Sequence, residues 1–268
     1  MENQIFNEDC LETMSRMSDS SIDLVVTSPP YDNLRSYDND IDQTWGQDVW
    51  KPIISELCRV IKEGGVIVWV VGDATIDGSE TGSSFKQALY FKECGLNLHD
   101  TMIWVKKGGG SIGSSYSYTQ NMEYMFILSK GRPSTFNPIK DCLNLTKGRV
   151  YKNRRRATTP DKGRVNAEPH FFEVKSHSKR NNWWYIPPQN KRILNSFHHP
   201  ATFPESLAQD HIISWSNKGE IVYDPFLGSG TTAKVAKQNK RKYIGSEINE
   251  EYFKMSKVRL DNTQEYLF

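Results

Sequence analysis

The feature that most constrains the fold is a run over residues 22–26, apolar except for Asp23, that leads into Thr27-Ser28-Pro29-Pro30-Tyr31. A predominantly apolar run of this length indicates a strand buried on both faces, as in a parallel sheet. Because the two prolines fix φ and remove two N–H donors, they end the strand in a rigid turn. Open α/β sheets bind ligands at the carboxyl ends of their strands. The segment is therefore a candidate site, and a plain strand-to-loop turn with an exposed Tyr31 is the alternative.

Strand-like and helix-like patterns alternate near both ends of the chain. Apolar runs predict strands over residues 4–6, 22–26, 66–71, 102–105, 124–128, 220–223 and 243–245. Apolar residues at helical spacing predict helices over residues 11–17, 53–61, 85–91, 207–213, 233–238 and 251–260. We expect Gly64-Gly65 to end the second of these helices. Strands that alternate with helices predict an α/β fold with a parallel sheet.

The composition is that of an ordinary globular protein, with 37% hydrophobic and 25% charged residues in a chain of 268. This length accommodates one large α/β domain with an insert. The four cysteines form no CxxC pair, which indicates a reducing compartment and neither a disulfide framework nor a zinc site. The histidines suggest no metal site either. A polar start and the lack of a long apolar run predict an intracellular protein without a membrane partner.

The segment between residues 140 and 180 is strongly basic, with 12 cations and 4 acids, although the whole chain carries a net charge of only +2. Aromatic residues are interleaved with these cations. The combination suits a nucleic-acid surface, where phosphates and bases are both contacted, and a solvated basic loop is the alternative. The candidate contacts are Lys147, Arg149, Lys152, Arg154, Arg155, Arg156, Lys179 and Arg180.

A second candidate site is the glycine-rich segment 224–232, Asp-Pro-Phe-Leu-Gly-Ser-Gly-Thr-Thr, which follows a predicted strand and opens a predicted helix. Glycines let the backbone approach a ligand, and a helix N-terminus offers free N–H groups. The segment matches the loose dinucleotide pattern, but residues 224–226 separate the strand from the glycines, which disfavours a nicotinamide cofactor. A Walker A loop is excluded because no Gly-Lys-Ser/Thr follows. Glu247, at the end of the next strand, is placed to accept two ribose hydroxyls.

Together, Ser-Pro-Pro-Tyr and the glycine-rich segment resemble the S-adenosylmethionine-dependent DNA amino-methyltransferases of the permuted β group. Further segments that match are residues 7–11, 59–65, 103–106, 199–204 and 243–247. The resemblance implies a Rossmann-like class I methyltransferase fold, with a mostly parallel twisted sheet, helices on both faces and an irregular basic target-recognition insert. It also implies a catalytic half over residues 1–131, a target-recognition region over 132–198 and a cofactor-binding half over 199–268.

The resemblance implies a role for each site residue. Catalysis would fall to Ser28, Pro29, Pro30 and Tyr31, with Tyr31 stacked on the base. Glu247 would hold the ribose of S-adenosylmethionine, and Asp9 and Cys10 would flank the adenine. The remaining cofactor-binding residues would be His199, Thr202, Phe203, Pro204, Asp224, Pro225, Phe226, Gly228, Ser229, Gly230, Thr231 and Thr232.

A serine before Pro-Pro-Tyr is typical of family members that methylate cytosine N4, and an aspartate or asparagine there is typical of adenine N6. The hydroxyl of Ser28 and the carbonyl of Pro29 could accept hydrogen bonds from the two amino protons of cytosine. The methyl group would then move directly to nitrogen, and no cysteine follows a proline, as ring-carbon methylation would require. The target base must be flipped out of the duplex.

The expected partner is double-stranded DNA, and the resemblance adds a homodimer and a cognate restriction endonuclease as candidates, in a cytoplasmic protein of prokaryotic or phage origin. Three alternatives remain open: the same chemistry on adenine N6, methylation of RNA or of a protein glutamine, and a non-catalytic DNA-binding relative.

Overall fold

The computed structural model describes residues 1–30, 45–106, 115–159, 163–188 and 204–265, and between residues 153 and 170 it describes the backbone alone. The chain forms two compact units. The larger unit combines Met1–Asn137 with Asn182–Phe268, and the smaller one is Pro138–Asn181.

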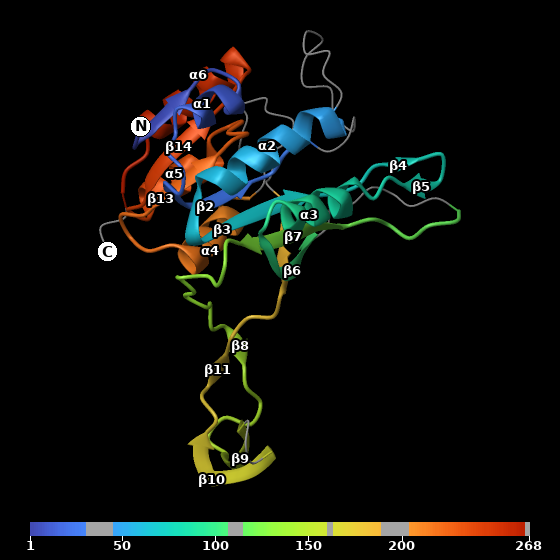
Figure 1. Cartoon of the computed structure of the whole chain (residues 1–268), viewed down its shortest axis with the longest axis vertical. Helices are drawn as coiled ribbons and strands as arrows, with labels where there is room; N and C mark the ends of the chain where they lie inside the picture. Colours follow the sequence, from blue (N-terminus) through green and yellow to red (C-terminus); the bar gives the residue numbers. More distant parts are fainter. Residues whose placement is uncertain (31–44, 107–114, 160–162, 189–203, 266–268) are drawn as a thin grey trace. The chain divides into compact units, whose positions relative to one another are not determined.

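The larger unit is built on an eight-stranded sheet with the order β1-β14-β13-β2-β3-β7-β6-β12 (Figure 1). Its strands are β1 (Gln4–Phe6), β2 (Ile22–Thr27), β3 (Ile61–Val71), β6 (Asn97–Lys106), β7 (Met122–Ser129), β12 (Trp183–Ile186), β13 (Ile221–Asp224) and β14 (Lys242–Ser246). A small hairpin of β4 (Thr75–Ile76) and β5 (Ser79–Glu80) lies outside this sheet. Strand β7 is antiparallel to β3 and β6, and the other neighbours are parallel. The predicted α/β fold with a mostly parallel sheet is confirmed.

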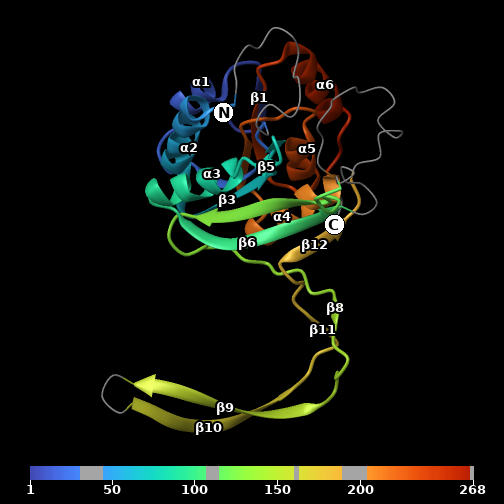
Figure 2. The ribbon, with the colours of Figure 1, turned by 90° about the vertical axis from the view of Figure 1, so that its right-hand side faces the viewer.

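Helices cover both faces of this sheet, as predicted (Figure 2). One face carries α1 (Cys10–Ser15), α2 (Gln47–Val60) and α3 (Ser83–Glu93), and the other carries α4 (Glu205–Trp215) and α5 (Thr231–Gln238). Helix α6 (Glu250–Asp261) packs beside α5, where Leu260 joins Leu227 and Ala233 in a small apolar cluster. None of the helices in the described ranges is long and apolar enough to cross a membrane.

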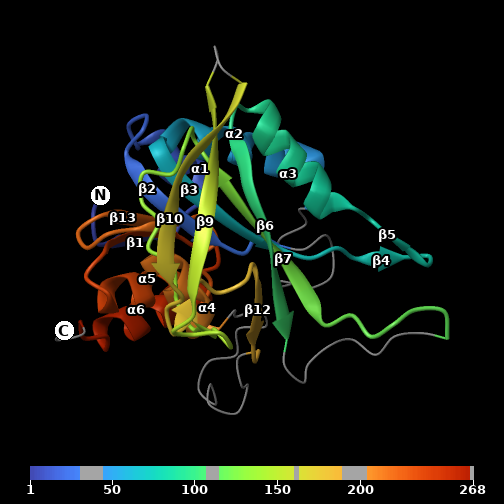
Figure 3. The same cartoon turned by 90° about the horizontal axis from the view of Figure 1, so that it is seen from below.

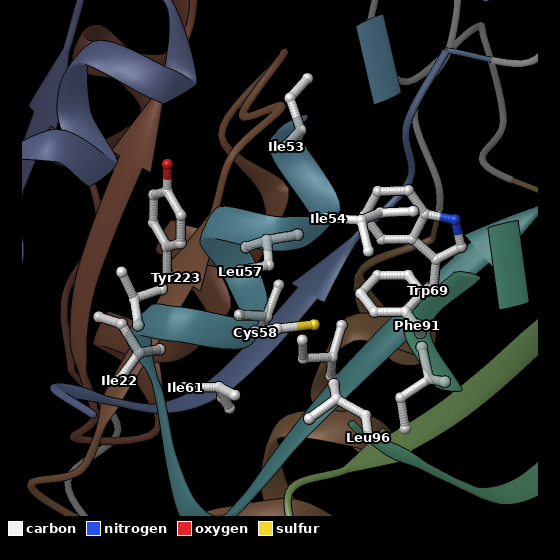
Figure 4. Close-up of a cluster of buried hydrophobic side chains, with 14 of the residues drawn as sticks. Ile22, Ile53, Ile54, Leu57, Cys58, Ile61, Trp69, Phe91, Leu96 and Tyr223 are labelled. Atoms are coloured by element: carbon white, nitrogen blue, oxygen red, sulfur yellow. The ribbon is translucent and has the colours of Figure 1, made fainter. Parts of the chain in front are cut away.

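The two faces of β2 explain why residues 22–26 are apolar except for Asp23. Val25 belongs to the core cluster that contains Leu57 of α2, which Figure 4 shows in close-up. Leu24 and Val26 belong to the cluster on the opposite face, together with Leu207 of α4. Successive side chains of a strand point to opposite faces, so a strand covered on both sides needs apolar residues on both faces. Asp23, the one charged residue of β2, forms an ion pair with Lys62 at 2.6 Å.

The predicted end of the second helix is wrong. Helix α2 ends at Val60, and Gly64 and Gly65 lie within β3. At Gly65 a Cβ atom would lie 2.9 Å from Cγ1 of Ile61 and 3.0 Å from the carbonyl oxygen of Asp23. The residue is therefore glycine because two segments of backbone approach closely there, and not because a helix needs a cap.

The smaller unit contains regular strands where the sequence indicated an irregular insert. Strand β9 (Val150–Thr159) pairs antiparallel with β10 (Gly163–Glu173), and β8 (Cys142–Leu143) pairs with β11 (His177–Ser178). Figure 3 shows β9 and β10 running side by side. A two-stranded ribbon encloses no core, so its sequence needs no alternation of apolar and polar residues. Strand β12 lies within the predicted target-recognition region, yet it pairs with β6 in the larger unit.

Candidate active site

The two segments singled out in the sequence meet at one edge of the sheet. Strands β14, β13 and β2 are parallel neighbours, so their carboxyl ends lie at the same edge. Residues 28–30 follow β2, residues 225–230 follow β13, and Glu247 follows β14. The sheet order therefore places the Ser-Pro-Pro turn beside the glycine-rich loop, 197 residues later in the chain.

Two hydrogen bonds join these loops directly. The hydroxyl of Thr27 donates to Oδ1 of Asp224 at 2.6 Å, and the hydroxyl of Thr232 donates to the carbonyl oxygen of Val26 at 3.1 Å. Both bonds are buried. Because Thr27 directly precedes Ser28, these bonds fix the position of the Ser-Pro-Pro turn relative to the loop.

The glycine-rich loop relies on the absence of side chains. Gly228 and Gly230 have φ values of 52° and 78°, a region that favours glycine. A Cβ atom on Gly230 would lie 2.9 Å from Cβ of Ser256 in α6. Helix α5 begins directly after Gly230. The first N–H groups of a helix have no partner within it, so the loop can present both bare backbone and N–H donors to a ligand.

Glu247 links the ends of the neighbouring strands. Its side chain accepts hydrogen bonds from the backbone N–H groups of Gly228 at 2.7 Å and Asn249 at 2.9 Å. Burial raises the pKa of this carboxyl, the two N–H groups lower it, and the charge of Asp224 raises it further. A carboxylate has about four lone-pair sites, so Glu247 keeps the capacity to accept hydroxyl groups from a ligand.

Asp224 is a buried acid beneath the loop, with 2% of its surface exposed. Burial raises its pKa to about 6, although the hydroxyls of Thr27 and Thr232 and the N–H of Phe226 lower it. The group carries a negative charge at neutral pH, and the hydroxyl of Thr27 and the N–H of Phe226 stabilise that charge by donating to it.

We expect Asp224→Asn to change how stability depends on pH. The unfolded chain releases this proton near pH 4 and the folded protein near pH 6, so the folded state binds more protons between these values. The contribution of Asp224 to the free energy of unfolding is therefore present below pH 4 and is lost as the pH rises through 6, a change of about 3 kcal/mol.

Urea denaturation of both proteins from pH 4 to pH 8 measures this effect. The free energy of unfolding of the variant should rise relative to that of the wild type across the window. A difference that stays constant with pH would contradict the predicted titration of Asp224.

The predicted adenine contacts, Asp9 and Cys10, come shortly after β1, which pairs with β14. Asp9 caps α1 by accepting a hydrogen bond from the N–H of Leu11 at 2.7 Å, and Cys10 begins that helix. Burial, followed by the charge of Asp9, raises the pKa of the Cys10 thiol, which is therefore neutral and apolar. The N–H of Glu247 donates to the carbonyl oxygen of Phe6 at 3.0 Å, which ties the end of β1 to the end of β14.

Comparison with known proteins decides the family. The N6_N4_Mtase family model, described as DNA methylase, matches residues 22–258. The chain belongs to this DNA methylase family.

Individual relatives agree with this assignment. The chain is 50% identical over 254 residues to the orphan methyltransferase M.BamHII of Bacillus amyloliquefaciens, covering 92% of this chain and 91% of that one. It is 28% identical to the DNA adenine methyltransferase YhdJ of Escherichia coli K12, covering 98% and 84%.

Two solved structures share the fold. The cytosine-N4-specific PvuII DNA methyltransferase has a TM-score of 0.69 at 20% identity, covering 97% of this chain and 86% of that one. A DNA modification methylase of Thermus thermophilus, in complex with S-adenosylmethionine, has a TM-score of 0.63 at 20% identity, covering 99% and 98%.

The chain of this DNA methyltransferase includes predicted site residues whose structure is not described. Tyr31, His199, Thr202 and Phe203 lie outside the described residues. Pro204 is described, and it is the buried N-cap residue of α4. The neighbouring predicted residues Pro225, Ser229 and Thr231 all lie in the segment between β13 and the first turn of α5.

All the predicted DNA contacts belong to the smaller unit. Lys147, Arg149, Lys152 and Lys179 are exposed. Arg180 forms an ion pair with Asp141 at 2.6 Å, so part of its charge is compensated within the protein. For Arg154, Arg155 and Arg156 the structure describes the backbone, which is part of β9. No group of three or more metal-ligating side chains occurs among the residues that the structure describes.

The sequence missed an aromatic cluster at the site. The ring of Phe226 meets Trp45 edge-on at 5.4 Å and Trp69 at 6.1 Å. Trp45 directly precedes the N-cap of α2, and Trp69 lies in β3 next to β2. A single tryptophan in a buried strand looks like an ordinary core residue. The sequence therefore carried no signal that the two tryptophan rings pack against Phe226.

Proposed function

We propose that this DNA methyltransferase transfers a methyl group from S-adenosylmethionine to N4 of a cytosine flipped out of double-stranded DNA. The observation that carries the proposal is the pair of hydrogen bonds that joins the Ser28 turn to the glycine-rich loop through Thr27, Asp224 and Thr232. Methyl transfer requires donor and acceptor to be held in line at contact distance. A rigid connection between the two loops meets this requirement.

The residues around the glycine-rich loop fit S-adenosylmethionine. Gly228 and Gly230 both have a left-handed backbone, and at Gly230 a side chain would collide with Ser256 of α6, so the loop passes this point as bare backbone. Glu247 would accept the two ribose hydroxyls, and Asp9 with Cys10 would flank the adenine. When bound, this cofactor supplies an activated methyl group on a sulfonium ion. The negative charges of the buried Asp224 and Glu247 favour a cationic ligand at this edge.

Ser28 and Pro29 provide the acceptors for the target amino group. Ser28 is half-buried at the sheet edge, directly after the hydrogen-bonded Thr27. Its hydroxyl and the carbonyl of Pro29 would accept hydrogen bonds from the amino protons and favour a pyramidal nitrogen with an available lone pair. Tyr31 would stack on the base.

Adenine N6 is the second candidate target. An adenine methyltransferase is among the relatives of this chain, and both bases carry an exocyclic amino group of the same kind. Ser28 favours cytosine, since the adenine-specific members that the sequence resembles have an acid or amide at this position. The PvuII enzyme of similar fold is cytosine-N4-specific, in agreement with the proposal.

The smaller unit would provide the DNA-binding surface. Residues 140–180 carry 12 cations against 4 acids. On the β9–β10 ribbon, Tyr151 stacks with Phe172 at 6.1 Å, and Nζ of Lys152 lies 5.6 Å from the centre of the Phe171 ring. All four side chains are exposed. Basic groups beside accessible aromatic rings suit contacts with both phosphates and bases.

Replacing Lys147, Arg149 and Lys152 by alanine is expected to weaken DNA binding and its salt dependence. Each lost phosphate contact lowers the slope of log affinity against log salt concentration by about 0.9, so three lost contacts lower it by about 2.7. The control replaces the exposed Lys86, Lys92 and Lys257, in helices of the larger unit, by alanine. Both variants lose three charges, and an equal change of slope would show that net charge alone is responsible.

The test of the reaction is transfer of labelled methyl from S-adenosylmethionine to duplex DNA of diverse sequence, with RNA and protein as competitors. We expect label in DNA alone. Folded protein that binds the cofactor but labels no DNA would overturn the proposal in favour of a non-catalytic relative, and label in RNA or protein would support those alternatives. The homodimer, the restriction endonuclease partner and the domain bounds 1–131, 132–198 and 199–268 stay predictions.

A further inference from the structure

We propose that Arg259 of α6 is a positioning residue for S-adenosylmethionine binding. It would hold the glycine-rich loop in its binding conformation and tie that loop to the N-terminus of α4. The inference rests on the proposed function and adds a residue that none of the sequence motifs includes.

Arg259 binds the loop through one end of its guanidinium group. Nη1 donates to the carbonyl oxygen of Ser229 at 2.9 Å, to the hydroxyl of Ser229 at 3.0 Å and to the hydroxyl of Thr231 at 3.1 Å. Only 12% of the arginine side chain is exposed. The three acceptors belong to the residues on either side of Gly230, so the guanidinium brackets the position at which the loop has a left-handed backbone.

The other end of the guanidinium reaches a second segment of the site. Nη2 donates to Oε1 of Glu205 at 2.6 Å, and Nζ of Lys234 binds the same oxygen at 2.6 Å. Burial raises the pKa of Glu205, but the hydrogen bonds from Lys234 and Arg259 outweigh it and lower the pKa overall. Glu205 is therefore charged at neutral pH. It directly follows Pro204, one of the residues predicted to bind the cofactor.

Helix α6 holds the loop at two points on one face. Ser256 is the residue that Gly230 approaches, and Arg259 lies three residues later, so both side chains project from the same side of the helix. The planar guanidinium donates to two segments at once, which the single ammonium of a lysine does less well. We infer that the loop geometry needed by the cofactor depends on this contact.

Arg241 offers a matched control, because it makes a similar set of hydrogen bonds away from the site. It donates to the hydroxyl of Ser216 at 3.1 Å, to the carbonyl of Asn239 at 2.7 Å and to the carbonyl of Ser216 at 2.6 Å. It lies between α5 and β14, at the amino end of β14, opposite to the edge that carries Glu247. Loss of Arg241 tests the cost of losing a partly buried arginine without disturbing the loop.

The experiment compares wild type, Arg259→Gln, Arg259→Lys and Arg241→Gln in the full chain. Calorimetry gives the Kd for S-adenosylmethionine, thermal unfolding gives Tm, and initial rates give the turnover at saturating cofactor. We expect Arg259→Gln to raise the Kd about tenfold and Arg259→Lys to raise it less. Turnover at saturating cofactor should stay close to that of the wild type for both. Arg241→Gln should lower Tm and leave the Kd unchanged.

The outcomes distinguish failure of the role proposed for Arg259 from failure of the proposed function. Unchanged Kd in a folded Arg259→Gln or Arg259→Lys protein would overturn the role of Arg259 and leave the proposed function intact. An equal rise in Kd for Arg241→Gln would also overturn it, because the effect would then follow from general destabilisation. A wild-type protein that does not bind S-adenosylmethionine would overturn the proposed function and this inference together.

Discussion

Replacing Ser28 by alanine is expected to lower the turnover of DNA methylation by about 100-fold or more, because the transition state loses one of its two fixed hydrogen-bond acceptors. The affinity for S-adenosylmethionine should stay the same, since the proposed cofactor contacts are the loop after β13 and Glu247. The side chain of Thr27, which joins the two loops, is unchanged in this variant. The measurements are single-turnover rates on duplex DNA and calorimetric cofactor binding.

Ser21→Ala is the matched control for this variant. Ser21 precedes the opposite end of β2, and its buried hydroxyl has no hydrogen-bond partner among the described residues. Its removal should leave turnover unchanged. A Ser28→Ala protein with normal turnover would show that the carbonyl of Pro29 and the stacking of Tyr31 are sufficient, and would remove the basis for a catalytic Ser28.

Replacing Gly230 by alanine is expected to weaken cofactor binding by about 100-fold or more and to lower stability. The left-handed backbone conformation costs a residue with a side chain about 1 kcal/mol. The new Cβ would also lie 2.9 Å from Cβ of Ser256 and 3.2 Å from its Cα, so the loop or α6 must move. Overpacking of this kind costs about 1–3 kcal/mol. A displaced loop would no longer match the ligand.

Gly219→Ala separates backbone strain from the collision. Gly219 has a φ of 85°, and a Cβ atom there would have nothing within 4 Å. This variant should lose about 1 kcal/mol of stability and keep its affinity for S-adenosylmethionine. Calorimetry and urea denaturation of both proteins make the comparison. Gly230→Ala with wild-type cofactor affinity would contradict the assignment of this loop to the cofactor.

The local features of the site could be predicted from the sequence. Residues 22–26 have a buried-strand pattern that must end at the sheet edge, and the prolines mark that end. Glu247 could be placed because it follows a strand directly. Such predictions succeed because the apolar pattern of a buried strand and the residues of a turn are both visible in the local sequence. The roles of these residues stay predictions, although the structure brings them together.

The connections between these features could not be predicted. The hydrogen bond from Thr27 to Asp224 joins residues 197 apart, and the contact of Arg259 with Ser229 depends on how α6 packs. Threonine and arginine are common at unrelated positions, so neither carries a local signal. The β9–β10 ribbon was missed for a different reason. It encloses no core, and strand prediction relies on the apolar pattern that a core imposes.

The central claim is that the Ser28 turn receives a cytosine. Nucleoside analysis of duplex DNA, methylated by the purified protein with labelled S-adenosylmethionine and digested to nucleosides, tests it most directly. The account predicts that the label is recovered as N4-methylcytosine. Recovery of the label as N6-methyladenine would contradict it.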